Sequence, residues 1–179
     1  LSLYTNQLNG TIPDCIGSLN KQQWFSLYSN GIRGTMPSSL SHLVSLQTLD
    51  LGMNRLNGTI PAELGELRSL QVLMLYSNQL SGAIPASVGN LSGLRQLSLG
   101  DNRFDSAPLL SSFASLQSLT TMYLYNTQLI GTVPDWFGNL SSLQELDLTG
   151  NRLSGTIPAA LGSLSSLREL NLRGNGLTG

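Results

Sequence analysis

The chain has 179 residues, a formal net charge of −1 and only 11% charged residues. It offers neither the basic stripe that nucleic acid requires nor an apolar run long enough to enter a membrane, so we expect neither contact in this segment. The only histidine, His42, has no nucleophile or carboxylate at a fixed spacing, and the carboxylates are scattered. We therefore expect no enzyme activity, no metal site and no cofactor.

A 24-residue repeat organises the whole chain. Residues 46–69, 70–93 and 143–166 fit one template, L-x-x-L-x-L-x-x-N-x-L-x-G-x-I-P-x-x-L-G-x-L-x-x, in which places are numbered as positions 1 to 24. A fixed period of about 20 to 50 residues predicts a solenoid, in which each unit packs only against its neighbours.

In chain order, the template divides the sequence into eight units. The first begins three positions late, and the fifth has one residue more than the template. We expect one continuous array over 1–179, with about six complete repeats between a partial first and a partial last one. Because solenoids need polar capping units, we interpret it as an uncapped fragment of a longer chain. The units are 1–21, 22–45, 46–69, 70–93, 94–118, 119–142, 143–166 and 167–179.

Each unit is predicted to contain one short strand. Leucines at positions 4 and 6, such as Leu49 and Leu51, alternate with other residues, which is the period of a half-buried strand. Strands of successive units then form a parallel sheet, joined by long crossovers that are right-handed because strands twist. We expect the apolar residues at positions 4, 6, 11, 15, 19 and 22 to be buried.

The turn after each strand carries an asparagine at position 9. We expect its inward-facing amide to satisfy backbone groups of its own turn and to tie that turn to the next repeat. The sixth unit has Thr127 instead, so its turn should be less well satisfied. The glycine at position 13 allows a tight bend, and the proline at position 16 sets a rigid path outside any interior ladder. The column consists of Asn6, Asn30, Asn54, Asn78, Asn102, Asn151 and Asn175.

The fifth unit departs from the template. Ser106 replaces the glycine at position 13, Pro108 comes one position early, and one residue is inserted before Leu116. Insertions in repeats map to loops, so we expect this crossover to bulge on the convex side. The bulge is either a neutral departure of the sequence from the template or a functional loop.

The pattern resembles the leucine-rich repeat family over the whole chain, since L-x-x-L-x-L-x-x-N-x-L is the signature of that repeat. The G-x-I-P block is similar to the plant-type 24-residue subclass, found in receptor-kinase ectodomains and polygalacturonase-inhibiting proteins. The resemblance implies an α/β solenoid: a right-handed array with a concave parallel β-sheet and short 3-10 or loop crossovers on its convex side. It also implies a non-enzymatic module of a cell-surface or secreted protein that binds a protein or peptide on the concave face.

Other functions stay open beside recognition. A structural arm within a larger extracellular assembly would suit an array without capping units. An inhibitor of an extracellular wall-degrading enzyme would match the resemblance to polygalacturonase-inhibiting proteins. Ice binding, which favours regular threonine ladders, is more remote, because Ala83 and Ala107 interrupt the threonines at position 14.

Residues that the template leaves free are the candidates for contact with a partner. Position 7 holds four of the five tyrosines, and Tyr123 lies two residues before Tyr125 on the same strand face. Strands about 4.8 Å apart would spread these aromatics over an arc of roughly 25 Å. Exposed aromatics often anchor interfaces, although tyrosine is also an ordinary strand residue. The candidate partner-binding residues are Tyr4, Trp24, Tyr28, Met74, Tyr76, Tyr123 and Tyr125.

The last units carry charged residues on the same face. We interpret them mainly as a solvated surface, on which opposite charges of neighbouring units, such as Glu145 and Arg168, can pair across strands.

Four N-x-[ST] sequons are candidate N-glycosylation sites, which favours an extracellular or cell-surface protein of the secretory pathway. They fall at positions 12 and 21, outside the predicted core, although the template itself produces N-G-T and N-L-S readily. The candidate asparagines are Asn9, Asn57, Asn90 and Asn139.

Overall fold

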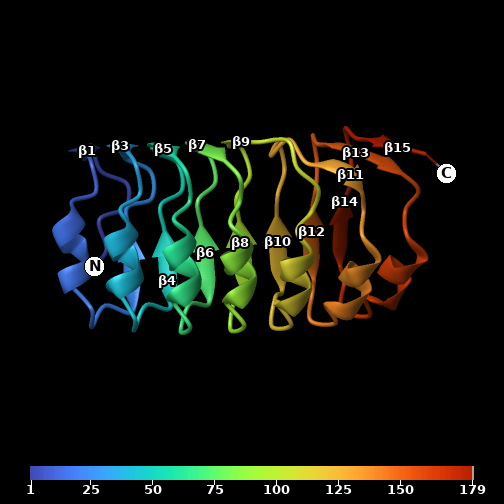
Figure 1. Ribbon diagram of the computed structural model, residues 1–179, viewed down its shortest axis with the longest axis horizontal. Coiled ribbons are helices and arrows are strands. Elements are labelled where there is room, and N and C mark those ends of the chain that lie inside the picture. Colours follow the sequence, from blue (N-terminus) through green and yellow to red (C-terminus); the bar gives the residue numbers. More distant parts are fainter. Residues whose placement is uncertain (179) are drawn as a thin grey trace.

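In the computed structural model, which describes residues 1–178, the units stack side by side as the coils of a solenoid (Figure 1). One strand from each of seven units enters a parallel sheet whose order follows the chain. Equivalent template positions pair, so that Leu49 faces Leu73 and Leu73 faces Leu97. The predicted solenoid is therefore confirmed. The strands of this concave sheet are β2 (Trp24–Ser26), β4 (Thr48–Asp50), β6 (Val72–Met74), β8 (Gln96–Ser98), β10 (Thr121–Tyr123), β12 (Glu145–Asp147) and β14 (Glu169–Asn171).

Short 3-10 helices form the opposite, convex side, and no α-helix occurs in residues 1–178. All but one of these helices follow directly after the proline at position 16, whose extended backbone is shown by Pro37 at φ −72° and ψ 141°. In the fifth unit, where the proline is displaced, Leu110 takes that place. The helices are η1 (Asp14–Ser18), η2 (Ser38–His42), η3 (Ala62–Glu66), η4 (Ala86–Asn90), η5 (Ser111–Ser115), η6 (Asp135–Asn139) and η7 (Ala159–Ser163).

A second parallel ladder runs along the edge of the solenoid (Figure 1), where the sequence predicted only a bend. Residues at positions 10 to 13 pair with the next unit, for example Asn57 with Gln79. Gly58 at position 13 has a φ of +72°, which confirms the predicted bend, because glycine adopts this conformation without a steric cost. The strands are β1 (Asn9–Gly10), β3 (Gly31–Gly34), β5 (Arg55–Gly58), β7 (Gln79–Gly82), β9 (Arg103–Phe104), β11 (Ile130–Thr132), β13 (Arg152–Gly155) and β15 (Gly176–Leu177).

The irregular fifth unit divides this second ladder. Strands β1 to β9 form one sheet and β11 to β15 another, and between them only a single bridge joins Pro108 to Ile130. A small cavity of ≈ 50 Å³ lies beside the break, with Leu109, Phe113 and Leu129 in its lining. The irregularity of the fifth unit therefore appears as an interruption of the second ladder.

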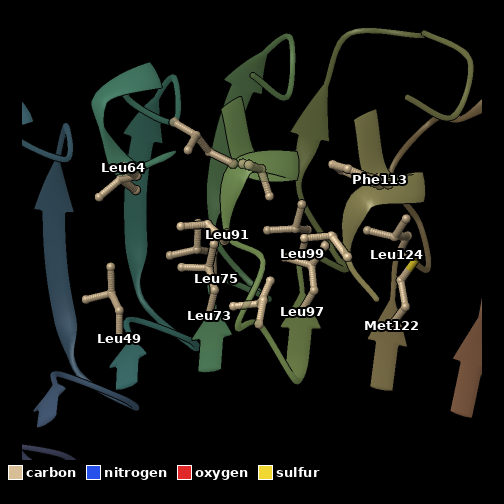
Figure 2. Close-up of a cluster of buried hydrophobic side chains, with 14 of the residues drawn as sticks. Leu49, Leu64, Leu73, Leu75, Leu91, Leu97, Leu99, Phe113, Met122 and Leu124 are labelled. Atoms are coloured by element: carbon tan, nitrogen blue, oxygen red, sulfur yellow. The ribbon is translucent and has the colours of Figure 1, made fainter. Parts of the chain in front are cut away.

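The leucine core fills the space between the concave sheet and the convex helices. Figure 2 shows Leu49 and Leu73 from the sheet and Leu64 and Leu91 from the convex side, and all four are fully buried. Each buried leucine contributes about 1.5–3 kcal/mol relative to an exposed one. The expected burial is thus confirmed for most of the apolar positions in the middle of the array, whereas Ile84, at position 15 of the fourth unit, is only partly buried.

At the two ends of the array, that expectation is wrong. Leu3 and Leu8 are each 37% exposed, Leu170 is 40% exposed and Ile157 is 57% exposed. A core side chain of a solenoid is covered by the units on both sides. These residues have a neighbouring layer on one side only, since the eighth unit stops before the position that would cover Ile157.

The asparagine ladder is present, but it runs in the direction opposite to the predicted one. The Asn54 amide nitrogen donates to the carbonyls of Leu27 (2.9 Å), Leu51 (3.2 Å) and Gly52 (3.1 Å), and its oxygen accepts from the amide of Ile32 (3.0 Å). Leu27 and Ile32 belong to the preceding unit. The backbone groups of Leu27 and Ile32 have no partner within their own turn, because the chain leaves the strand there. The Asn54 amide therefore binds the preceding unit rather than the next one.

Thr127 replaces this amide incompletely, as expected. Its hydroxyl is 2.6 Å from the Leu124 oxygen and 3.2 Å from Oδ1 of Asn151, two contacts in place of the four made by Asn54. The link back to the fifth unit comes instead from Gln128, whose Nε2 donates to the Phe104 oxygen at 2.8 Å.

Candidate functional site

From the second to the sixth unit, tyrosine and glycine alternate at position 7, and the rings of Tyr76 and Tyr125 each lie across the glycine of the preceding unit. A Cβ atom on Gly52 would meet Tyr76 Cε1 at 2.8 Å, and one on Gly100 would meet Tyr125 Cε1 at 2.5 Å. By leaning over Gly52, the Tyr76 ring comes within 6.3 Å of the Tyr28 ring, centroid to centroid. Tyr28 and Tyr76 lie two units apart, so their backbones are expected to be separated by roughly 9.6 Å. The rings are closer than the backbones because the Tyr76 ring leans toward Tyr28. We call Tyr28, Tyr76 and Tyr125 the tyrosine strip.

Small residues in and just after β8 open a hollow in the concave sheet. Ser98 and Gly100 occupy positions 5 and 7 of the fifth unit, between neighbours that carry Met74 and Tyr76 on one side and Tyr123 and Tyr125 on the other. The resulting space has a volume of ≈ 300 Å³, and a second space of ≈ 170 Å³ around Ser98 adjoins it. The lining of the first space, which we call the aromatic hollow, is Met74, Tyr76, Ser98, Tyr123, Tyr125 and Asp147.

Carboxylates shape the electrostatics of this face. The Tyr123 hydroxyl donates to a carboxylate oxygen of Glu145, and this bond, aided by burial, raises the pKa of Tyr123 to about 12. Burial is the main reason that the pKa of Tyr125 is also raised, and the negative charges of Asp101 and Asp147 add to it. The hollow therefore combines neutral phenol rings with negative charge at its rim.

The expected cross-strand pairing of Glu145 with Arg168 is wrong. In the register of β12 and β14, Glu145 lies opposite Glu169, and no ion pair joins Glu145 to Arg168 in residues 1–178. Arg168 precedes β14 by one residue, so its side chain leaves the backbone on the other face.

The predicted partner-binding residues divide into two groups. Met74, Tyr76, Tyr123 and Tyr125 meet in the aromatic hollow, with Tyr28 against Tyr76. The other two, near the first strand, stand apart from the hollow: Tyr4 is 56% exposed and Trp24 is 53% exposed.

Sequence reasoning missed the small and acidic members of the hollow. Ser98, Gly100 and Asp147 matter here because of what stands beside them, and the template treats their positions as free. The alternation of tyrosine and glycine at position 7 was the available signal, since a large ring needs a neighbour without a side chain.

The threonines at position 14 have a packing role. The Thr35 methyl lies 2.9 Å from the place of a Cβ atom on Gly58 in the next unit, and Thr59 has the same relation to Gly82 at 2.7 Å. Each threonine thus packs against a glycine that lacks a side chain, and this packing accounts for the recurrence of threonine at position 14.

The candidate glycosylation asparagines are all exposed. Asn9 and Asn57 lie on the second ladder, and Asn90 and Asn139 end the helices η4 and η6. Within residues 1–178, no group of three His, Cys, Asp or Glu side chains is placed to hold a metal ion. No helix of that part of the chain is long and apolar enough to cross a bilayer.

Family profiles match more than half of the chain. One described as "Leucine rich repeat" matches residues 117–177, and one described as "Leucine Rich Repeat" matches 45–67 and 69–91. No curated protein gives a significant match.

Among solved structures, the chain is similar to the ectodomain of the Arabidopsis thaliana receptor kinase GASSHO1/SCHENGEN3 in complex with CASPARIAN STRIP INTEGRITY FACTOR 2. The TM-score is 0.94 at 40% identity, over 100% of this chain and 21% of that one. It is also similar to the Arabidopsis receptor kinase HAESA in complex with the peptide hormone IDA and the co-receptor SERK1, with a TM-score of 0.92 and 35% identity over 98% and 30% of the two chains.

A plant ice-binding protein is a third similar structure, with a TM-score of 0.83 and 32% identity over 95% of this chain and 55% of that one. This chain therefore spans about a fifth to a half of the structures it resembles. From its repeat template, its stacked parallel strands and these matches, the chain belongs to the leucine-rich repeat family.

Proposed function

We propose that this segment is a non-enzymatic recognition module that binds a protein or peptide on its concave sheet, through the tyrosine strip and the aromatic hollow. The observation that carries this proposal is the gathering of half-buried tyrosine rings around an open hollow. Rings already held by packing lose little conformational freedom when a partner binds, and aromatic side chains supply large contact areas. Similar structures include receptor ectodomains solved with peptide ligands, which supports the same class of partner.

We also infer an extracellular location for the parent protein. All four candidate glycosylation asparagines are exposed, as glycan attachment requires. The receptors of similar structure are ectodomains of membrane proteins. Nucleic acid is a poor partner for this surface, because carboxylates rather than a basic stripe border the hollow.

The test is capture of a partner from an extract of the source tissue. The wild-type array is compared with a variant in which Tyr28, Tyr76 and Tyr125 are all changed to alanine. We expect the variant to lose the partner, since interface anchors typically contribute about 2 kcal/mol or more each. A matched control changes Glu63 and Glu66, exposed on the convex side, to alanine and should capture as well as wild type.

Circular dichroism and thermal melting show whether the triple variant remains folded. Equal capture of the same partner by the wild type and by a folded triple variant would contradict the proposal. So would a cross-linking map that places the partner on the convex helices alone, and that result would favour a structural arm.

A further inference from the structure

The floor of the aromatic hollow contains a polar group without a partner. Ser98 is only 6% exposed and lines both adjoining spaces. Its hydroxyl makes no hydrogen bond to any group in residues 1–178, whereas the equivalent Ser26 accepts one from the amide of Tyr28 at 3.3 Å. This hydroxyl faces the open hollow, so it is free to accept a hydrogen bond from a ligand, and a ligand that covered it without such a bond would leave it unsatisfied at a cost.

The walls of the hollow suit a cation. Tyr76, Tyr123 and Tyr125 surround it, and the faces of such rings attract ammonium and guanidinium groups. Asp147 adds a carboxylate, one oxygen of which is held by the amide of Thr149 at 2.8 Å. That bond fixes the carboxylate in place and leaves its second oxygen for a ligand.

The charges next to the hollow also favour a positively charged ligand. Glu145 and Glu169 lie directly opposite each other on β12 and β14, an arrangement of like charges that destabilises a sheet. No arginine or lysine forms an ion pair with Glu145 or Asp147 in residues 1–178. The pKa of Tyr123 is raised mainly by its hydrogen bond to Glu145 and that of Tyr125 mainly by burial, and in both cases neighbouring carboxylates add to the rise. A bound positive charge would relieve this repulsion.

Building on the proposed function, we propose that the aromatic hollow binds the side chain of an arginine in an extended peptide ligand. The guanidinium plane stacks on the tyrosine rings, pairs with Asp147 and donates a hydrogen bond to Ser98. Lysine fits less well, because its ammonium is strongly hydrated and cannot stack. An apolar side chain would cover Ser98 and Asp147 without satisfying either group.

The test uses three synthetic probes, acetylated and amidated Gly-Gly-Arg-Gly-Gly and its citrulline and lysine analogues. Citrulline keeps the shape of arginine but carries no charge. Each probe is titrated into the array while backbone amide resonances are followed by NMR. We expect saturable shifts at Ser98, Tyr123 and Tyr125 with the arginine probe, and at least about tenfold weaker binding of citrulline, equivalent to about 1.4 kcal/mol.

Two variants connect the binding to the hollow. Asp147→Asn should remove most of the difference between arginine and citrulline, whereas Asp135→Asn on the convex helix η6 should change nothing. Ser98→Leu should fill the hollow and abolish binding of all three probes, with its melting temperature showing that the fold persists. Equal binding of the arginine and lysine probes, or of arginine and citrulline, would overturn the assignment, as would shifts confined to residues outside the hollow.

This subsite and the proposed function can fail separately. If the triple tyrosine variant loses its partner but arginine and citrulline bind alike, recognition stands and the arginine subsite is wrong. If the arginine probe binds as expected but a folded triple variant still captures the partner, the subsite stands and the wider proposal is wrong.

Discussion

The ring of Tyr125 lies across the backbone of Gly100, so close that a Cβ atom at Gly100 would be 2.5 Å from both Cε1 and Cζ of the tyrosine. This contact places the ring at the edge of the hollow formed by the fifth unit. The glycine thus helps to shape the hollow that we propose as a recognition surface, although it has no side chain to contribute.

Changing Gly100 to alanine should therefore displace the ring without unfolding the array. We expect a change in stability below about 1 kcal/mol, since alanine makes the unfolded chain less flexible than glycine does, and this offsets part of the collision. Nuclear Overhauser contacts between Tyr125 and β8 should weaken, together with binding of the arginine probe. Gly162→Ala is the control, because a Cβ atom there meets nothing within 4 Å. An unmoved Tyr125 ring in the Gly100 variant would contradict this account.

Asn54→Ala should lower the free energy of unfolding by about 1–3 kcal/mol, because it leaves buried backbone groups of two units without partners. Asn57→Ala offers a matched control in the same unit, since Asn57 is exposed and makes no side-chain hydrogen bond in residues 1–178. Urea denaturation of both variants gives the comparison. Equal midpoints for the two variants would show that the asparagine ladder is not a stabilising element.

The period of the sequence was enough to predict the strands of the concave sheet, their parallel pairing and most of the buried leucines, because each unit packs against its neighbours in the same way, but it did not predict the second ladder. It could not predict the direction of the asparagine bonds. Leu27 and Ile32, which receive the Asn54 amide, are ordinary template residues, and only the three-dimensional turn shows which unit leaves its backbone groups unpaired.

The candidate site was predictable only in part, for a related reason. The tyrosine column can be read from position 7, but the way in which Tyr76 reaches Tyr28 depends on ring direction over Gly52. The hollow itself forms because the fifth unit carries no large side chain at positions 5 and 7. A template records which residues recur, and Ser98 and Asp147 acquire a role only from their neighbours across the strands.

The link between Tyr123 and Glu145 predicts how stability depends on alkaline pH. The pKa of Tyr123 is about 12 in the folded chain, against an ordinary value of about 10 in the unfolded chain. Above about pH 10 the unfolded state releases a proton that the folded state retains, so stability should fall as the pH rises towards 12. Below pH 10 this residue should have no effect on the slope.

Glu145→Gln tests that relation, because it removes the charge but keeps the shape. We expect tyrosinate absorbance to show Tyr123 ionising nearer its ordinary pKa, with a smaller loss of stability between pH 10 and 12. Tyr123→Phe identifies which absorbance step belongs to this residue. An unchanged titration in the glutamine variant would exclude Glu145 as the main cause of the raised pKa.

Position 8 gives a prediction about backbone strain. Met53 has a φ of +53°, whereas the same position in the seventh unit is Gly150 at +67°. The left-handed conformation costs a non-glycine residue about 1–2 kcal/mol, although glycine also makes the unfolded chain more flexible. Because Met53 is exposed and loses little packing, Met53→Gly should raise the free energy of unfolding by up to about 1 kcal/mol.

Two further variants show whether the backbone angle is the cause. Gly150→Ala should be destabilising, since its new Cβ atom meets the Asn126 side-chain oxygen in a conformation that already disfavours alanine. Arg55→Gly, at an exposed strand position of the same unit as Met53, should cost about 0.5–1 kcal/mol, because glycine only adds entropy to the unfolded state there. If Met53→Gly and Arg55→Gly destabilise the array equally in urea, the left-handed angle at position 8 carries no strain, and the turn prefers that angle whichever residue occupies it.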